Sequence, residues 1–308
     1  GKLSTADETI EYIRARLAYL GTSRPTAVNL FDAIGKLNSV VVDRRRQQGD
    51  AGSAEDIINT YVDAAEGMLE LDIADNRAIG EHGAKYLSQR NAAADEDKMC
   101  VLTHCNTGSL ATAGYGTALG IVRSLFARGK LAHAYFTETR PYNQGSRLTA
   151  FELKADGIPS TLVCDSAASF LMNMQKIGAV VVGADRVATN GDTANKIGTY
   201  QLALAVRAHG VDFIVAAPTT SIDLGIASGN EIPVEQRDGR EITHVSGILV
   251  GDDRVDNKRQ AVQVAVDGIE TWNPSFDVTP AEYITAIVTE RGVVENKDFD
   301  KIKDILQG

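Results

Sequence analysis

The chain is poor in cysteine and contains no long hydrophobic run. Its 308 residues include only three cysteines, an odd number without Cys-x-x-Cys spacing. This usage argues against a disulfide-stabilised secreted domain and against a cysteine zinc site. We therefore predict no metal site. We expect a reducing, cytoplasmic location, with a nuclear pool also allowed.

Positive charge is scarce as well. The 31 Lys and Arg residues are outnumbered by 41 Asp and Glu residues, which gives a formal net charge of −10. Nucleic acids and anionic membrane surfaces favour basic proteins, no apolar run could cross a bilayer, and the first residues do not resemble a signal peptide. The sequence thus predicts neither a nucleic acid nor a membrane as partner, and local basic residues are expected to bind a small anion.

The chain divides into two regions of different pattern. In the first, apolar residues recur at helical spacing, for example Ile10, Ile13 and Leu17, and Pro25 is well placed to open a helix. Polar stretches at 44–50 and 91–97 are interpreted as exposed connections. We therefore predict a mainly helical domain over 1–97 and an α/β domain over 98–308.

In the second region, short apolar runs alternate with helical patterns. This alternation predicts a mainly parallel, Rossmann-like sheet covered by helices on both faces. The expected helices lie near 110–128, 147–156, 166–176 and 196–209. The expected strands are 99–103, 132–137, 160–164, 179–183, 213–217 and 286–289.

One glycine-rich stretch is a poor candidate for a nucleotide site. The segment 114–120 resembles a dinucleotide-binding fingerprint, but its third glycine comes one position late. It also falls inside a helical pattern instead of directly after a strand. Close helix packing explains these glycines better.

Cys105 follows an apolar strand and precedes a turn rich in Asn and Gly. Most cytosolic cysteines are small buried hydrophobes, and we interpret Cys100 and Cys164 in that way. Cys105 differs because a helix expected to begin near Ser109 would lower its pKa and stabilise a thiolate. His104 is expected to be a core or supporting residue.

Asp185 occupies the corresponding position after the apolar run 179–183. It could simply cap a helix or pair with Arg186. A desolvated sheet end would instead raise its pKa, and a protonated Asp185 could act as a general acid. Amides and an ammonium group follow at 190–196 and suit a phosphorylated sugar.

Two further segments are candidates for anion binding. The segment 138–147 follows a strand and carries Arg140 and Arg147, whose guanidinium groups are expected to face the same crevice as Cys105. Arg24 precedes Pro25 at an expected helix N-terminus, where an anion is favoured. A solvated ion pair is the alternative for each of these arginines.

Together these segments closely resemble the methylthioribose-1-phosphate isomerase family over nearly the whole chain. The resemblance implies an aldose–ketose isomerase of methionine salvage that needs no cofactor and forms a homodimer. It further implies a preceding Arg-Gly-Ala-Pro segment that helps to bind phosphate, and this chain begins after that point. The matching stretches are SRPTAVN (23–29), THCNTGSLAT (103–112), ETRPYNQG (138–145), GADR (183–186), NGDTANKIGT (190–199), WNPSFDVTP (272–280) and TERG (289–292).

The resemblance assigns roles position by position. Cys105 and Asp185 match the catalytic pair of the family, as candidate base and general acid. The hydrogen could move from C2 to C1 as a proton, through an enolate, or as a hydride. Alternatives to this function are a ribose-1,5-bisphosphate isomerase and a regulatory subunit of a translation-initiation nucleotide-exchange factor. The residues that match substrate contacts are Arg24, Gln144, Asn195 and Lys196.

Overall fold

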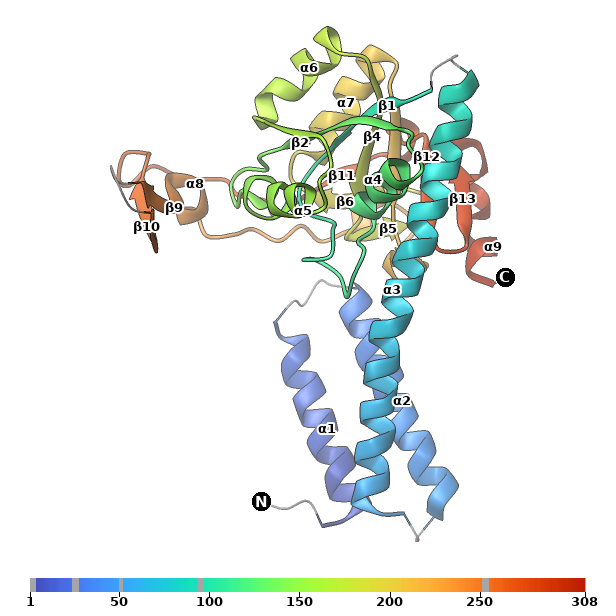
Figure 1. Ribbon diagram of the computed structural model, residues 1–308. Coiled ribbons are helices and arrows are strands. Elements are labelled where there is room, and N and C mark those ends of the chain that lie inside the picture. The colour runs from blue at the N-terminus through green and yellow to red at the C-terminus, as the bar shows by residue number, and fades with distance from the viewer. Residues whose placement is uncertain (1–3, 24–27, 50–51, 94–96, 251–254, 308) are drawn as a thin grey trace.

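Three long helices project from a rounded α/β body (Figure 1). The computed structural model describes residues 4–23, 28–49, 52–93, 97–250 and 255–307. A shared apolar cluster, which includes Ile10, Ile13 and Leu17, holds the three helices together. The predicted helical region is therefore confirmed. The helices are α1 (Ala6–Gly21), α2 (Val28–Gln48) and α3 (Ala54–Ala93).

The basic run after residue 43 is helical, contrary to the expected connection over 44–50. Helix α2 continues to Gln48, and its last turn carries Arg45, whose Nε lies 2.7 Å from Oδ1 of Asp7 on α1. Cations at a helix C-terminus are favoured by the helix dipole, which explains why this polar run extends the helix. Of the other connection, 91–93 belong to α3. Pro25 lies outside the described residues.

Helix α3 connects the two parts of the molecule. Its first half packs in the three-helix bundle, whereas Ile79 and Leu87 of its second half belong to the same apolar cluster as Val101 of the sheet. Figure 1 shows this helix running past the bundle and along the α/β body. The division at 97/98 stays a prediction.

A seven-stranded sheet forms the centre of the α/β body, in the order β13-β12-β7-β4-β1-β2-β3. All neighbouring pairs are parallel except β12 and β13. The six predicted strands are all present in it, so the predicted fold class is confirmed. The strands are β1 (Met99–Thr103), β2 (Leu131–Thr137), β3 (Ser160–Val163), β4 (Ile177–Gly183), β7 (Asp212–Ala216), β12 (Ala286–Thr289) and β13 (Gly292–Glu295).

Each face of this sheet is covered, which is why its strands are almost uniformly apolar. On one face, Val101 and Val181 pack against Ile121 of α4. On the other, Leu102 and Val180 pack against helices α6 and α7. The helices are α4 (Ala118–Ala127), α5 (Ala150–Ala155), α6 (Ala168–Met174), α7 (Thr199–His209), α8 (Arg240–Thr243) and α9 (Ile302–Gln307), with a π-helical turn over Gly145–Thr149 and 3-10 turns over Asp165–Ala167, Thr219–Ser221, Gly229–Glu231, Ala281–Tyr283 and Asn296–Lys301.

Two smaller β elements were not predicted. A four-stranded sheet has the order β11-β6-β5-β8, and a separate hairpin joins β9 to β10. The hairpin and α8 project from one side of the body (Figure 1). These strands are β5 (Arg186–Ala188), β6 (Thr193–Lys196), β8 (Ile222–Asp223), β9 (His244–Val250), β10 (Val255–Gln263) and β11 (Phe276–Thr279).

Two helix predictions near the functional segments are wrong at their N-terminal ends. Residues 110–117 form turns and bends instead of a helix, and α4 begins only at Ala118. Residues 196–198 are not helical either, because β6 ends at Lys196 and α7 begins at Thr199. The glycines of 114–120 do serve close packing: a Cβ on Gly120 would lie 3.3 Å from the Asn76 carbonyl oxygen of α3.

Candidate active site

The order in which the chain adds strands to the sheet reverses between β1 and β4. From β1 the chain adds β2 and β3 on one side, whereas β4, β7 and β12 extend the sheet on the other side. Ligands of open α/β sheets bind at such a switch point, beyond the carboxyl ends of the strands. Cys105 follows β1 and Asp185 follows β4, so the two side chains come from the two strands that flank this point.

An open cleft of about 400 Å³ lies at this end of the sheet. It collects five of the six residues expected at the site. Arg24 lies outside the described residues, but Asn29 of the same sequence segment lines the cleft. The residues that line it are Asn29, Asp72, Asn76, Cys105, Asn106, Thr107, Ala111, Thr112, Thr117, Gln144, Leu148, Gly183, Ala184, Asp185, Asn195, Lys196, Pro218, Thr220, Ser221 and Phe276.

Cys105 is held in an unusual backbone conformation. Its φ angle is 66°, in the left-handed region that non-glycine residues rarely adopt. Its N–H donates to Thr139 Oγ1 at 2.9 Å, and its carbonyl oxygen accepts from Thr149 Oγ1 at 2.5 Å. Residues held in such conformations cluster at functional sites because the surrounding contacts must fix them. The two threonine hydroxyls therefore fix the backbone of Cys105 where it lines the cleft.

The thiol of Cys105 is protonated in this environment, contrary to the expected thiolate. Cys105 is only 9% exposed, and burial raises its pKa to about 11, with the Asp185 carboxylate adding to the rise and Lys196 opposing it. The expected helix N-terminus near Ser109 does not exist, so no helix dipole offsets the burial.

Asp185 reaches the cleft at the start of the smaller sheet. Its backbone N–H donates to the Ala194 carbonyl at 2.9 Å, which ties the end of β4 to β6. The neighbouring Arg186 approaches Asp223, with 3.4 Å between Nη1 and Oδ2. The carboxyl of Asp185 thus lies beside the strand that carries Asn195 and Lys196.

The two residues expected at a helix start are strand residues. Asn195 and Lys196 end β6, which pairs with β11 through Lys196 and Phe276. The Lys196 ammonium lies 5.1 Å from the centre of the Phe276 ring, and Asn195 Nδ2 donates to Thr199 Oγ1 at 3.0 Å. The lysine therefore supplies a positive charge on the wall next to Asp185.

The segment after β2 contributes Gln144 but not its arginines. Arg140 Nη2 donates to the Ile242 carbonyl at 2.9 Å, and Arg147 Nη1 donates to the Tyr142 carbonyl at 3.0 Å. Neither arginine lines the cleft, so the expectation for their guanidinium groups is wrong. The segment is anchored by Asp165, which accepts the backbone N–H of Arg140 at 2.6 Å.

His104 has the supporting place expected of it. Its Nδ1 lies 2.5 Å from Thr137 Oγ1, and its Nε2 lies 2.8 Å from the Ile197 carbonyl oxygen. Burial lowers its pKa, so the ring stays neutral. It joins the ends of β2 and β6 from beneath the cleft.

Several buried oxygen atoms on cleft-lining residues have no protein partner among the described residues. They are Oδ1 of Asn76, Oδ1 of Asn106, Oγ1 of Thr107 and Oε1 of Gln144, all on residues that line the cleft. Buried polar atoms are normally hydrogen-bonded, so the residues around this cleft hold acceptors that the described protein groups do not satisfy. Within the described residues, no group of three or more His, Cys, Asp and Glu side chains could hold a metal ion.

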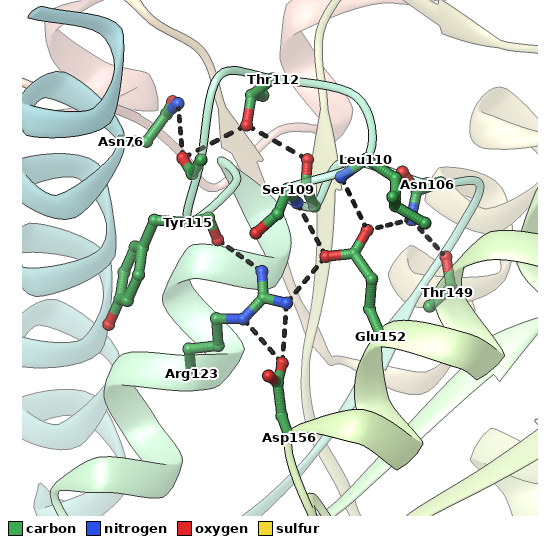
Figure 2. A network of polar contacts seen from close by, with 12 residues as sticks. Asn76, Asn106, Ser109, Leu110, Thr112, Tyr115, Arg123, Thr149, Glu152 and Asp156 are labelled. Carbon is green, nitrogen blue, oxygen red and sulfur yellow. Dashed lines mark hydrogen bonds and ion pairs between the residues drawn. The ribbon is translucent and has the colours of Figure 1, made fainter. Parts of the chain in front are cut away.

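A buried ion-pair network that was not predicted lies behind the cysteine loop, the loop 106–117 that follows Cys105 (Figure 2). At its centre is Glu152 of α5, which is 4% exposed and accepts a hydrogen bond from Arg123 Nη2 at 2.7 Å. Glu152 falls on a predicted helix, where a glutamate is usually solvated. Only its contacts with a loop about forty residues earlier in the chain, such as the Asn106 amide at 2.9 Å, bury it.

Comparisons with known proteins agree with this geometry. A model of the initiation factor 2 subunit family matches residues 1–296. The chain belongs to this family. Methylthioribose-1-phosphate isomerases of Paracoccidioides brasiliensis and of Oryza sativa subsp. indica are 54% and 53% identical to it, over 97% and 98% of this chain and 79% and 78% of their own lengths.

Solved structures of the family have the same fold. A 5-methylthioribose 1-phosphate isomerase from Pyrococcus horikoshii is 36% identical, with a TM-score of 0.82 over 100% of this chain and 78% of that chain. A structure titled translation initiation factor eIF-2B, subunit delta, from A. fulgidus is 35% identical, with a TM-score of 0.77 over 100% of this chain and 82% of that one. The resemblance seen in the sequence is confirmed, and the chain is an isomerase.

None of the described helices is long and apolar enough to cross a membrane.

Proposed function

We propose that this chain converts 5-methylthioribose 1-phosphate to 5-methylthioribulose 1-phosphate in methionine salvage, with Asp185 as general acid and Cys105 as base. One observation carries the assignment of residues: a carboxyl and a thiol come from the two strands at the switch point and line one polar cleft. The substrate is taken from the names of the relatives that share half of its sequence.

The first step is ring opening. The anomeric oxygen of this substrate carries phosphate, so the ring cannot open through a free hemiacetal as in ordinary aldoses. An acid must protonate the ring oxygen while its bond to C1 breaks. Asp185 supplies this proton, and the carboxylate that remains stabilises the positive charge that develops at C1.

The second step moves a hydrogen from C2 to C1. The Cys105 thiolate removes the C2 proton, and the electron pair of that bond forms the double bond of an enol phosphate. The thiol then returns a proton to C1, while the proton of the C2 hydroxyl passes to the Asp185 carboxylate. A ketone forms at C2, and both protein groups regain their starting state.

Cys105 and Asp185 are proposed to share one proton, and the raised pKa of Cys105 determines which of them carries it. In the free protein the Cys105 thiol holds this proton, because burial raises the thiol pKa to about 11. Transfer of that proton to Asp185 produces the acid and the base together without any exchange with solvent. The transfer also removes the carboxylate charge that raises the pKa of the thiol, and Lys196 favours the thiolate.

The remaining residues bind the substrate. Lys196 and Arg24 offer positive charge to the phosphate, and ionised partners form the strongest hydrogen bonds to such groups. Asn195 and Gln144 bind the sugar hydroxyls, for which the unpartnered Oε1 of Gln144 is a suitable acceptor.

The test is to assay the purified full-length protein against 5-methylthioribose 1-phosphate and ribose 1,5-bisphosphate, in water and in D₂O. We expect turnover of the first compound, and measurable solvent deuterium at C1 of the product because part of the thiol proton exchanges with solvent before it is returned to C1. Cys105→Ser and Asp185→Asn should each keep substrate binding but lose about two orders of magnitude or more in kcat. Cys164→Ser is the matched control, since Cys164 is exposed, contrary to the buried position expected from the sequence, and does not line the cleft.

Each other outcome has a distinct meaning. Faster turnover of ribose 1,5-bisphosphate would make that compound the substrate in place of 5-methylthioribose 1-phosphate. No turnover of either compound would favour a regulatory subunit. Complete retention of the C2 hydrogen would favour hydride transfer over the enolate. Cys105→Ser with the activity of the unmodified protein would remove Cys105 from the reaction.

A further inference from the structure

A fully hydrogen-bonded carboxylate lies directly behind the cysteine loop but outside the cleft. Glu152 accepts the backbone N–H of Ser109 at 2.7 Å and that of Leu110 at 3.1 Å. It also accepts from the Asn106 side chain at 2.9 Å and from Arg123 at 2.7 Å (Figure 2). An ionised carboxylate has room for about four such bonds, so every acceptor position of Glu152 is used.

Thr149, one helical turn earlier, holds the preceding part of the loop. Its hydroxyl donates to the Cys105 carbonyl at 2.5 Å and accepts from Asn106 Nδ2 at 3.3 Å. Thr149 and Glu152 are spaced by three residues, so they lie on the same face of the helical segment. This one face therefore contacts the loop at Cys105, Asn106, Ser109 and Leu110.

The loop is packed too closely on the carboxylate for any side chain to intervene. A Cβ on Gly108 would lie 2.3 Å from Glu152 Oε2 and 2.4 Å from Oε1. Distances below 3.0 Å are essentially never seen for real Cβ atoms. The Gly108 position is thus fitted to Glu152.

Arg123 of α4 stabilises the buried negative charge of Glu152. It lies 2.7 Å from Glu152 and 2.7 Å from Asp156, and its Nη1 donates to the Tyr115 carbonyl at 2.5 Å. Burial alone would raise the pKa of Glu152, but the hydrogen bonds from Arg123, Asn106 and the loop outweigh it and lower the pKa. The carboxylate is therefore ionised at neutral pH, and both ends of the 106–117 loop are tied to one ion pair.

We propose that Glu152 is a positioning residue for the reaction at Cys105. Together with Thr149, its carboxylate fixes the loop that keeps the Cys105 backbone in the left-handed conformation and places the thiol at the cleft. This inference rests on the proposed function. Loss of the carboxylate charge leaves the N–H groups of Ser109 and Leu110 opposite a weaker acceptor. The loop then relaxes and Cys105 leaves its strained conformation.

The experiment uses three variants of the full-length protein: Glu152→Gln, Thr149→Val and Thr149→Ser. Gln keeps the size of Glu but loses its charge, whereas Val removes the hydroxyl donor that Ser retains. Asp212→Asn is the matched control for a broken ion pair, because Asp212 binds Arg90 at 2.6 Å and does not line the cleft. Each variant is measured for kcat, KM and the alkylation rate of every cysteine by site-resolved mass spectrometry.

The three cysteines separate local from global effects, since Cys164 is exposed, Cys100 is partly buried and Cys105 is buried. We expect Glu152→Gln and Thr149→Val to lower kcat by about 10- to 100-fold with a much smaller change in KM, because small misplacements of a reacting group are costly. Alkylation of Cys105 should rise about tenfold relative to Cys100, as local opening predicts. Thr149→Ser should restore both values, and Asp212→Asn should leave them unchanged.

The inference is overturned if Glu152→Gln folds and keeps its kcat and its Cys105 alkylation rate. It is equally overturned if Cys100 and Cys105 become reactive together, which would indicate general destabilisation. Should Glu152→Gln fail to fold, equal behaviour of Thr149→Val and Thr149→Ser would overturn it. A wrong substrate is recognised separately, because the alkylation rates require no turnover.

Discussion

Asp277 is a carboxyl whose ionisation is linked to the start of a helix. Its Oδ2 accepts the Gly198 N–H at 2.7 Å and its Oδ1 accepts the Tyr200 N–H at 3.1 Å, which caps α7 just after Lys196. Burial raises its pKa to about 6, although the two N–H donors act in the opposite direction. The protein therefore has a carboxyl that changes charge near physiological pH.

The sign of the resulting pH dependence follows from linkage. The pKa of Asp277 in the folded protein, about 6, is above the ordinary value of 3.8, so its protonated form is favoured by folding. Its contribution to stability is complete below about pH 4 and is lost as the pH rises through about 6. In Asp277→Asn this contribution is absent.

We therefore expect the unfolding free energy of the unmodified protein to fall, relative to Asp277→Asn, between about pH 4 and pH 7. Urea unfolding curves of both proteins across this range measure the difference. Parallel pH dependences of the two proteins would show that Asp277 keeps an ordinary pKa.

The sequence was sufficient to bring the two proposed reacting residues to one cleft but not to predict their chemical state. Cys105 and Asp185 could be found because each follows an apolar strand, and strand ends meet at the switch point. The raised pKa of Cys105 comes from its burial, and the Thr139 and Thr149 hydroxyls that hold its backbone are distant in sequence. Glu152 could not be found for the same reason, since local pattern does not distinguish a buried helical glutamate from a solvated one.

At the scale of elements, the contact between α3 and α4 depends on the absence of side chains. A Cβ on Gly80 would lie 2.8 Å from Ser124 Oγ and 2.9 Å from the Gly120 carbonyl oxygen. The backbones of the two helices therefore approach closely there. Gly67, on the same helix, has no heavy atom within 4 Å of its Cβ position and is exposed.

These two glycines should respond to alanine in opposite directions. Gly67→Ala should stabilise the protein by about 0.5–1 kcal/mol, because alanine loses less backbone entropy in a helix. Gly80→Ala should destabilise it by about 1–3 kcal/mol, the usual cost of overpacking. Thermal and urea unfolding measure both changes, and a stabilising Gly80→Ala would contradict the close helix contact.

Strands and helices were predicted correctly where burial of apolar side chains determined the sequence pattern. The central strands are apolar on both faces, so their sequences alone indicated six of the seven strands of the main sheet. The short strand β6 instead has the polar sequence Thr193-Ala194-Asn195-Lys196 and is extended because it pairs with β11. Its strand state is a property of tertiary pairing, which explains why a helix was expected to start at Lys196.

At the scale of the whole molecule, the family resemblance leads us to propose a homodimer. Sedimentation equilibrium of the full-length protein should give twice the mass of one chain, which is 32.9 kDa for these 308 residues. A single-chain mass at the concentrations used in the activity assay would contradict this proposal.

The continuous helix α3 also has a mechanical consequence. With 40 residues, it is about 60 Å long, and it fixes the bundle to the α/β body along one half of its length. Asn29, near the described start of α2, lines the cleft, whereas the end of α2 and the start of α3 lie at the far tip (Figure 1). The bundle is thus a lever whose pivot lies beside the cleft: the free half of α3 is about 30 Å long, so a tilt of one degree displaces the tip by about 0.5 Å. A force applied at the tip would therefore be larger at the cleft wall, near the pivot. A random displacement of the tip would be much smaller there.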